Sequence, residues 1–283
     1  MRGTSWLPIR LRGEMSGIEE RFPRPSVMGV VNVTPDSFSD GGVNFRTEDA
    51  VASAQRMIEE GAAIVDVGGE STRPGSEGVS ADQELRRVVP VLEALHALPL
   101  SIDTAKAAVA SRAIELGAEL VNDVTALRGD PELAGVVAGS GAYLCLMHMQ
   151  GEPRTMQERP TYADVAAEVA SFLEERLRFA VEAGIPEERI CLDPGFGFGK
   201  TVEQNFELLA RLGEIVALGR PVLVGLSRKR SLGRILADPD ATTGSLSASL
   251  AAAVEAYERG AAIFRVHDVR EHVEALTVAA AVR

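Results

Sequence analysis

Eight short apolar runs alternate along this chain with eight longer segments of helical periodicity, and no other feature constrains the fold as strongly. In a half-exposed strand every second residue is polar, and these runs lack that alternation. Continuous apolar runs are typical of parallel strands that are covered on both faces. We therefore predict eight parallel strands. They are residues 28–33, 63–68, 100–103, 120–123, 143–148, 189–193, 221–226 and 262–266.

The intervening segments predict helices at residues 47–60, 82–95, 105–116, 131–138, 162–183, 202–216, 243–259 and 269–282. Glycine tolerates the left-handed conformation of a helix C-cap, so four helices are expected to stop at Gly61, Gly117, Gly184 and Gly260. Eight successive β-then-α units favour an α/β fold of the (β/α)8 TIM type in a single domain. A doubly wound open sheet is the alternative.

The composition suits a large core, because 46% of the 283 residues are hydrophobic and 25% are charged. A formal net charge of −12 repels nucleic acid and anionic membranes, so neither is expected as a partner. No run approaches the roughly 18 apolar residues of a membrane span, and the apolar piece at 6–9 is too short for a secretory signal. These features favour a cytoplasmic protein. We interpret residues 1–24 as an N-terminal extension and residues 25–283 as the barrel.

Polar side chains gather where the predicted strands end. In a barrel of parallel strands these ends share one face, and active sites form there. Two of the three lysines, Lys200 and Lys229, follow strands in this way. Asp123 is adjacent to Asn122 and points to the opposite side of its strand, which favours a structural role. The other strand-end residues are Asn32, Asp66, Asp103, Asn122, His148, Asp193, Arg265 and His267.

The types of these residues indicate a ligand. Arg265 and His267 are two apart on one strand, so their side chains share a face and suit an anionic group such as phosphate. Asp103 and Asp193 are acceptors in an otherwise apolar barrel, which suits a flat heterocycle with a row of N–H donors. The sequence therefore predicts a site for a planar base that carries an anion.

The glycine-rich run GFGFGKT at 195–201 only superficially resembles a phosphate loop. The first glycine of that motif would fall on Pro194. We interpret the run as a tight loop whose glycines allow the close approach of a flat ligand. Asp36 lies in a Pro-Asp-Ser triplet and has two interpretations: it is a residue of the site, or it simply starts a turn.

The remaining residues with metal or redox chemistry predict no such site. The four histidines have no metal-ligand spacing, so zinc is not expected. His96 and His272 lie in predicted helices and are expected at the surface. Cys145 and Cys191 lie in apolar runs and are expected to be buried thiols.

Eight segments, in order, resemble the motifs of the dihydropteroate synthase family. Together they run from about residue 26 to the end of the chain, and eight matches in one order are very specific. The segments are MGVVNVTPDSFSDGG (28–42), DVGGESTRPG (66–75), SIDT (101–104), VNDV (121–124), MH (147–148), LDPGFGFGKT (192–201), SRKR (227–230) and RVH (265–267).

The resemblance implies a site. The pterin would be held by Asp103, Asn122, Asp193 and Lys229, with Met147 and Phe198 as apolar neighbours. Mg2+ would be bound by Asn32, and the diphosphate by Thr72, Arg73, Arg265 and His267. The 4-aminobenzoate would lie near residues 227–230, where this chain has Arg230 in place of the serine found in many relatives. The implied catalytic residues are Asp36, Arg73, Lys229, Arg265 and His267.

The implied reaction joins a dihydropterin diphosphate to 4-aminobenzoate and gives dihydropteroate and diphosphate. The family suggests a homodimer. A folate–corrinoid methyltransferase domain and a non-catalytic pterin-binding paralogue are the alternatives. The loops at 34–45 and 71–79 hold few large apolar residues, so we expect them to be mobile and to close over both substrates.

Overall fold

The structure is a computed structural model that describes residues 16–34, 47–72, 75–236, 238 and 240–282. Parallel strands form one eight-stranded sheet in the order β6-β5-β4-β3-β2-β1-β8-β7. A parallel bridge between Leu192 and Val222 connects its two ends, so the sheet closes. The predicted (β/α)8 barrel is confirmed, and the open doubly wound sheet is excluded.

The strands coincide closely with the predicted runs, although β7 keeps only two residues of the six predicted. Their bounds are β1 Ser26–Asn32, β2 Ile64–Gly68, β3 Leu100–Asp103, β4 Ala118–Asp123, β5 Tyr143–Met147, β6 Ile190–Asp193, β7 Leu223–Val224 and β8 Ile263–Val266. Most strand residues are buried on both faces, which explains why the sequence shows unbroken apolar runs.

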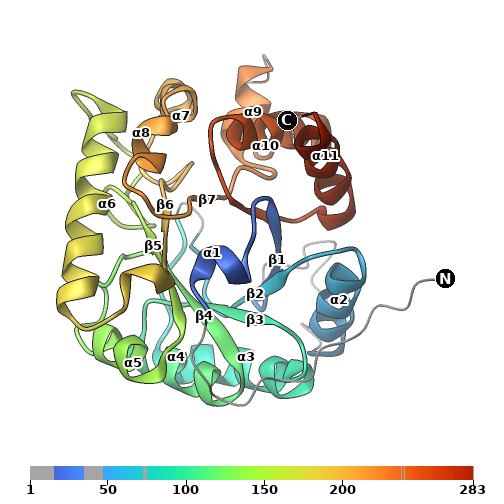
Figure 1. The fold of residues 1–283 in the computed structure, drawn as a ribbon, viewed down its shortest axis with the longest axis vertical. Helices are drawn as coiled ribbons and strands as arrows, with labels where there is room; N and C mark the ends of the chain where they lie inside the picture. The colour runs from blue at the N-terminus through green and yellow to red at the C-terminus, as the bar shows by residue number, and fades with distance from the viewer. Residues whose placement is uncertain (1–15, 35–46, 73–74, 237, 239, 283) are drawn as a thin grey trace.

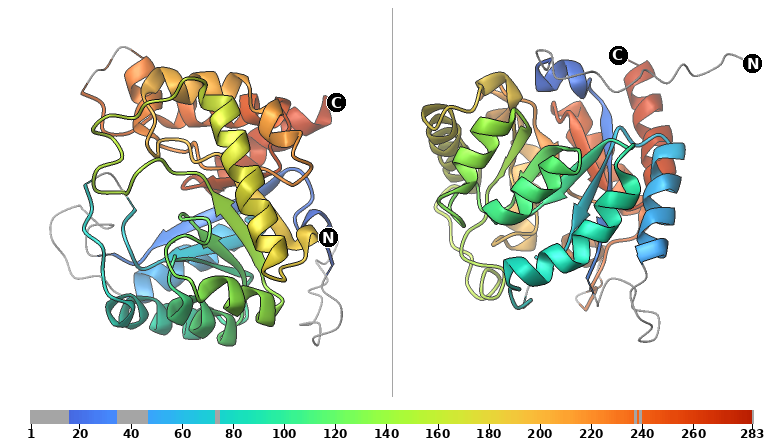
Figure 2. Two further views of the ribbon diagram at one scale, coloured as in Figure 1. Left: turned by 90° about the vertical axis from the view of Figure 1, so that its left-hand side faces the viewer. Right: turned by 90° about the horizontal axis from the view of Figure 1, so that it is seen from below.

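Helices surround the strands on the outside, and α6 runs along one side of the barrel (Figures 1 and 2). The predicted helix at 202–216 is two helices, α7 and α8, and the helices α1 and α9 were not predicted. The helices are α1 Ile18–Arg21, α2 Thr47–Glu59, α3 Ala81–Leu95, α4 Ala107–Glu115, α5 Leu133–Ser140, α6 Val165–Glu182, α7 Val202–Ala210, α8 Gly213–Val216, α9 Arg230–Ile235, α10 Leu246–Glu258 and α11 Val269–Ala281, with a 3-10 turn η1 at Glu187–Arg189.

Local capping explains several boundaries. Ser80 and Gln83 form a capping box at the start of α3, and Thr201 and Gln204 form another at the start of α7. The four glycines that were predicted as helix stops all have positive φ, between 94° and 106°. Their lack of a Cβ allows the chain to turn from each helix into the next strand.

The amino-terminal end of the barrel is covered by α1 and the residue after it. Phe22 is 1% exposed and meets the Tyr143 ring edge-on, with 5.8 Å between the centroids. The Tyr143 hydroxyl donates to the Ser16 carbonyl at 2.8 Å, and Arg21 pairs with Glu119 of β4. The packed barrel therefore begins before residue 25, within the segment expected to lie outside the main fold.

Other expectations are decided by burial. Cys145 and Cys191 are buried free thiols, as predicted. His96 is exposed, but the surface position expected for His272 is wrong. His272 faces the core from α11, with its Nδ1 2.6 Å from the Asp268 carbonyl oxygen. Within the described residues, no helix is long and apolar enough to cross a membrane.

We predict that Phe22→Ala destabilises the whole barrel by about 3–5 kcal/mol, because the deletion leaves a cavity under the strands. Urea unfolding measures the change. The matched control is Val278→Ala on α11, whose side chain is 67% exposed, and its effect should stay within about 0.5 kcal/mol. Equal effects of the two substitutions would show that α1 and Phe22 are not part of the cooperative core.

Candidate active site

An arginine bridges two carboxylates at the mouth of the barrel. Arg265 of β8 donates from Nε to Asp66 Oδ2 at 2.7 Å and from Nη2 to Asp103 Oδ2 at 2.9 Å. Asp66 also accepts from Ser101 Oγ at 2.6 Å and from Asn122 Nδ2 at 3.0 Å. Strands β2, β3, β4 and β8 are thus tied together by one buried polar network.

Asp66 is a residue of this site to which the sequence analysis gave no role. Its side chain is fully buried, and it accepts from three side chains. A buried acid in the middle of the apolar run IVDVG was the available signal, because an unpaired carboxylate cannot be left there.

Burial dominates the electrostatics of the network. Burial raises the pKa of Asp103 to about 7, and the Arg265 guanidinium opposes this rise. Burial alone would lower the pKa of Arg265, but Asp66 and Asp103 hold that pKa above its ordinary value. Arg265 is therefore charged at every accessible pH, whereas Asp103 is easier to protonate than an ordinary carboxyl group.

Asn122 supplies an acceptor with nothing bound to it. Its Oδ1 is buried and has no hydrogen-bond partner among the described residues. Since native proteins seldom leave a buried acceptor unpaired, such an atom in a polar pocket indicates a ligand donor. Asn122 and the adjacent Asp103 therefore present acceptors side by side on paired strands.

A third carboxylate, Asp193, ends β6. Asp193 Oδ1 accepts from the Gly195 amide at 2.7 Å, and burial raises the pKa of Asp193 to about 6. Lys229 Nζ lies 4.3 Å from the centroid of the Phe198 ring, and burial lowers the pKa of Lys229 to about 8. Met147 is buried at the end of β5. Carboxylate, ammonium and apolar surfaces therefore adjoin here, as expected from the sequence.

The turn after β7 sends neighbouring side chains in different directions. Arg228 has a φ of 57° and pairs with Asp268 at the surface. Its amide donates to Ser249 Oγ at 2.9 Å. Lys229 points instead toward Phe198, while Arg230 begins α9 and is half-buried. Of these three, Lys229 is the one that interacts electrostatically with Asp193 and Asp103.

The residues expected to bind an anion are only partly described. His267 lies beside Ser227, with Nδ1 and Oγ 3.3 Å apart, and burial lowers the pKa of His267 to about 4. Its imidazole is therefore neutral near pH 7. Asp36, Arg73 and most of the loop at 34–45 lie outside the described residues.

Thr72 and Asp103 line a cavity of about 480 Å³ beside the polar network. The segments that follow β2, β3, β4 and β5 line it. The Gly75 amide donates to the Pro153 carbonyl at 3.1 Å, which joins the loops after β2 and β5. Its lining adds acidic and hydroxyl side chains, among them Glu70, Glu152, Thr104 and Thr125. The cavity therefore gives access to the network from one side.

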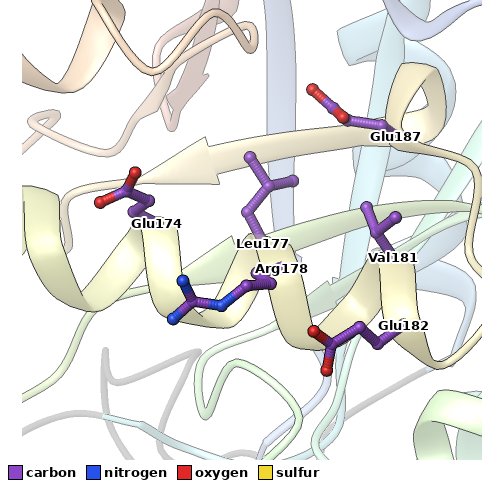
Figure 3. A pocket seen from close by; sticks show the side chains of 6 residues that line it. All are labelled: Glu174, Leu177, Arg178, Val181, Glu182 and Glu187. Carbon is purple, nitrogen blue, oxygen red and sulfur yellow. The ribbon is translucent and has the colours of Figure 1, made fainter.

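A smaller cavity, of about 290 Å³, lies on the outer face of α6 and is bounded by Glu187 of η1 (Figure 3). It is lined by Leu177, Val181 and four charged side chains that solvent reaches. None of the strand-end residues contributes to it, so we do not assign it to the active site.

Asn32 is the residue with the chemistry to bind a metal ion. It ends β1. A Cβ added at Gly68 would lie 3.7 Å from Asn32 Oδ1 and 3.6 Å from Asp103 Oδ2, so both oxygens lie beside Gly68. No cluster of three or more acidic, histidine or cysteine side chains that could hold a metal exists in the described ranges. A cation here would need most of its oxygen ligands from a bound anion and water, which fits Mg2+.

Asp123 has the structural role expected for it. Its carboxylate accepts from the amide and hydroxyl of Thr125 and from the Leu127 amide, at 2.6–2.8 Å. These bonds hold a turn in which Ala126 and Leu127 both have positive φ.

Known proteins resemble this chain in sequence and in fold. The family model described as "Pterin binding enzyme" matches residues 28–267. Dihydropteroate synthase of Escherichia coli K12 is 49% identical over 257 residues, which is 90% of each chain. The structure of Xanthomonas albilineans dihydropteroate synthase with 4-aminobenzoic acid superposes with a TM-score of 0.83, at 50% identity over 92% of this chain and 93% of that one. The same enzyme with 7,8-dihydropteroate gives 0.80 at 47% identity, over 92% and 94%.

We predict that Asp193→Asn stabilises the protein above pH 6. In the folded state the carboxyl keeps its proton up to a pKa of about 6, whereas the unfolded chain loses it near pH 4, so the wild type loses stability between these values. The gain should grow from nothing near pH 4 to about 2–3 kcal/mol above pH 6.

Urea unfolding at pH 4.5 and 7.5 measures this gain. Asp164→Asn is the control, because Asp164 is an exposed carboxylate that pairs with Arg211 and has a lowered pKa. It should give no stabilisation in the same window. A pH-independent effect of Asp193→Asn would contradict the raised pKa.

Proposed function

Because the chain belongs to the dihydropteroate synthase family of pterin-binding enzymes, we propose that it condenses 6-hydroxymethyl-7,8-dihydropterin diphosphate with 4-aminobenzoate. The products are 7,8-dihydropteroate and diphosphate. The chain would thus act as a transferase of alkyl groups in folate biosynthesis.

The observation that carries this proposal is the ring of buried acceptors at the barrel mouth. Asp103, the free Oδ1 of Asn122 and Asp193 come from three strands. Both carboxylates interact electrostatically with Arg265 and with Lys229, so they lie around the same space. A dihydropterin is flat and presents a row of N–H donors, which three such acceptors can satisfy. Phe198 and Met147 supply apolar surfaces for its faces.

The protein's contribution to the reaction is mainly electrostatic. The aniline nitrogen forms a bond to the methylene carbon as the C–O bond breaks, and the electron pair leaves with diphosphate. The nitrogen then loses its proton to solvent. Asp103 and Asp193 support the electron-poor pterin, and the permanent charge of Arg265 faces the departing anion. An arylamine is already a neutral nucleophile, so no strong base is required.

Mg2+ is the proposed cofactor, with Asn32 as its protein ligand. When bound to the diphosphate, the ion neutralises charge on the leaving group. His267, neutral at pH 7, would donate one hydrogen bond to the same anion, and Thr72 would donate another. Asp36 and Arg73 are proposed to act in catalysis and Arg230 near the aminobenzoate carboxylate, on the strength of the family motifs alone.

Family resemblance also supports a homodimer in the cytoplasm. Sedimentation of the purified protein would test the homodimer. The loops at 34–45 and 71–79 are proposed to close when both substrates are bound. Within the described part of the second loop, Glu70 Oε1 accepts from the Val79 amide at 3.2 Å, so the two ends of that loop lie together.

The direct test is to mix the protein with the dihydropterin diphosphate, 4-aminobenzoate and Mg2+. We expect equal amounts of dihydropteroate and diphosphate to form. Chelation of Mg2+ should suppress turnover but should not weaken binding of the pterin alcohol, which has no diphosphate. Tight pterin binding without product would favour the non-catalytic paralogue, and methyl transfer from a folate to a corrinoid protein would favour the methyltransferase.

We predict that Arg265→Ala and Asp103→Asn differ in which ligands they weaken. Asp103→Asn removes charge-assisted hydrogen bonds to the heterocycle and replaces one carboxylate oxygen by an N–H donor, so pterin diphosphate and pterin alcohol should both bind about 2–3 kcal/mol less tightly. Arg265→Ala should weaken both ligands, because it leaves Asp66 and Asp103 without their cation. It should weaken the diphosphate more than the alcohol, because it also removes the charge that faces the anion. Calorimetry with both ligands separates the two patterns. Equal weakening of the two ligands in Arg265→Ala would remove Arg265 from the anion site.

A further inference from the structure

Lys200 is a buried lysine for which the proposed reaction has no use. Its side chain follows β6 and is 2% exposed. The Nζ atom lies 2.9 Å from His148 Nδ1, 2.9 Å from the Gly195 carbonyl oxygen and 3.1 Å from the Phe198 carbonyl oxygen. An ammonium group has three N–H donors, and here each has one acceptor.

The acceptors are neutral, which is unusual for a buried ammonium. In the described part of the chain, no carboxylate forms an ion pair with Lys200. Burial lowers the pKa of His148 to about 2, so its ring is neutral, and its Nδ1 accepts from Lys200. Burial also lowers the pKa of Lys200 to about 7, although Asp193 opposes this. A group that is costly to bury and that touches only neutral acceptors is not explained by ion pairing.

The loop around Lys200 has an irregular backbone. Gly195, Gly197 and Gly199 all have positive φ, at 68°, 80° and 60°. A side chain on Gly195 would clash with the carbonyl of His148. Inside the loop the Phe198 amide donates to the Gly195 carbonyl at 3.1 Å. The loop forms no regular ladder, so its other carbonyls need donors from side chains.

Side chains supply those donors. Gln157 donates to the Gly197 carbonyl at 2.6 Å, and the Tyr162 hydroxyl donates to that of Gly199 at 2.8 Å. The Gly197 amide donates to Asn205 at 2.6 Å. Of these donors, Lys200 is the one that bonds two carbonyls of the loop, and its side chain is buried.

The same loop forms part of the proposed pterin pocket. Its first amide, Gly195 N, donates to Asp193 Oδ1, and its fourth residue, Phe198, lies against the Lys229 ammonium. The carbonyls of these same two residues, Gly195 and Phe198, are the ones that Lys200 binds. Lys200 therefore acts on both ends of the segment that presents Phe198 and orients Asp193.

We propose that Lys200 is a positioning residue for the heterocycle pocket, and that its ammonium fixes the 195–199 loop so that Asp193 and Phe198 can bind the flat ring. The inference rests on the proposed function for the identity of the ring, but the positioning of the loop does not depend on turnover. Lys200 touches no reacting atom in this arrangement.

The test compares Lys200→Met with Leu276→Ala, a core truncation in α11 that should also destabilise the fold. In Lys200→Met the Kd of the pterin alcohol should rise at least tenfold and the KM of the pterin diphosphate should follow. The kcat at saturation should fall much less. Amide exchange at Gly195 and Gly197 should become faster, while exchange in α11 should be unchanged.

In Leu276→Ala, amide exchange in α11 should become faster, while exchange at Gly195 and Gly197 and the Kd of the pterin alcohol should be unchanged. Lys200→Gln keeps N–H donors in a shorter side chain, so it should restore part of the loop protection. An unchanged Kd with unchanged exchange at Gly195 and Gly197, or the same loss in Leu276→Ala, would overturn the proposal. If the wild type binds pterin but makes no dihydropteroate, the proposed function fails and the positioning role is still tested.

A measurement on the wild type covers the case in which the variants do not fold. The chain has three lysines, so 15N-lysine labelling gives three ammonium signals. At pH 6, below the Lys200 pKa of about 7, one signal should exchange with water much more slowly than the others. Three signals that exchange like free lysine would refute the enclosed, fully hydrogen-bonded ammonium.

Discussion

Arg265 reaches from the last strand of the barrel to carboxylates on the second and third, and the arrangement of the mouth depends on this contact. Asp66 and Asp103 are almost fully buried, and two such charges could not remain together without a cation. Asn122 donates its amide N–H to Asp66, and its Oδ1 has no hydrogen-bond partner among the described residues. One ion-pair network thus compensates the carboxylates and leaves acceptors for a ligand.

The cost of this arrangement appears in the pKa values. Burial raises the pKa of Asp103 and Asp193, and it lowers that of Lys200 and Lys229. Each of these groups is therefore less stable in its charged form than it would be in water. The barrel tolerates them because its apolar core is large, and a ligand with matching donors and acceptors would relieve part of the cost.

The glycine-rich loop shows how local and distant constraints combine. Its three glycines permit the backbone conformation, but they do not select it. Side-chain donors select this conformation. Gln157 after β5 and Tyr162 before α6 donate from outside the loop, and Lys200 donates from the residue that follows it. The apolar ring of Phe198 can then lie against Lys229 without any regular secondary structure to support it.

The sequence by itself determined eight parallel strands with intervening helices, which are compatible with a barrel or with a doubly wound open sheet. The parallel bridge between Leu192 and Val222 decided for the barrel. The sequence also located Asp103, Asn122, Asp193 and Lys229, because strand ends of a parallel barrel share one face. Only the tertiary structure decided the partners: that Arg265 pairs with Asp66, that α1 covers the barrel, and that His272 is buried. These depend on contacts between residues up to 199 positions apart, and the spacing of residues along one strand carries no information about such contacts.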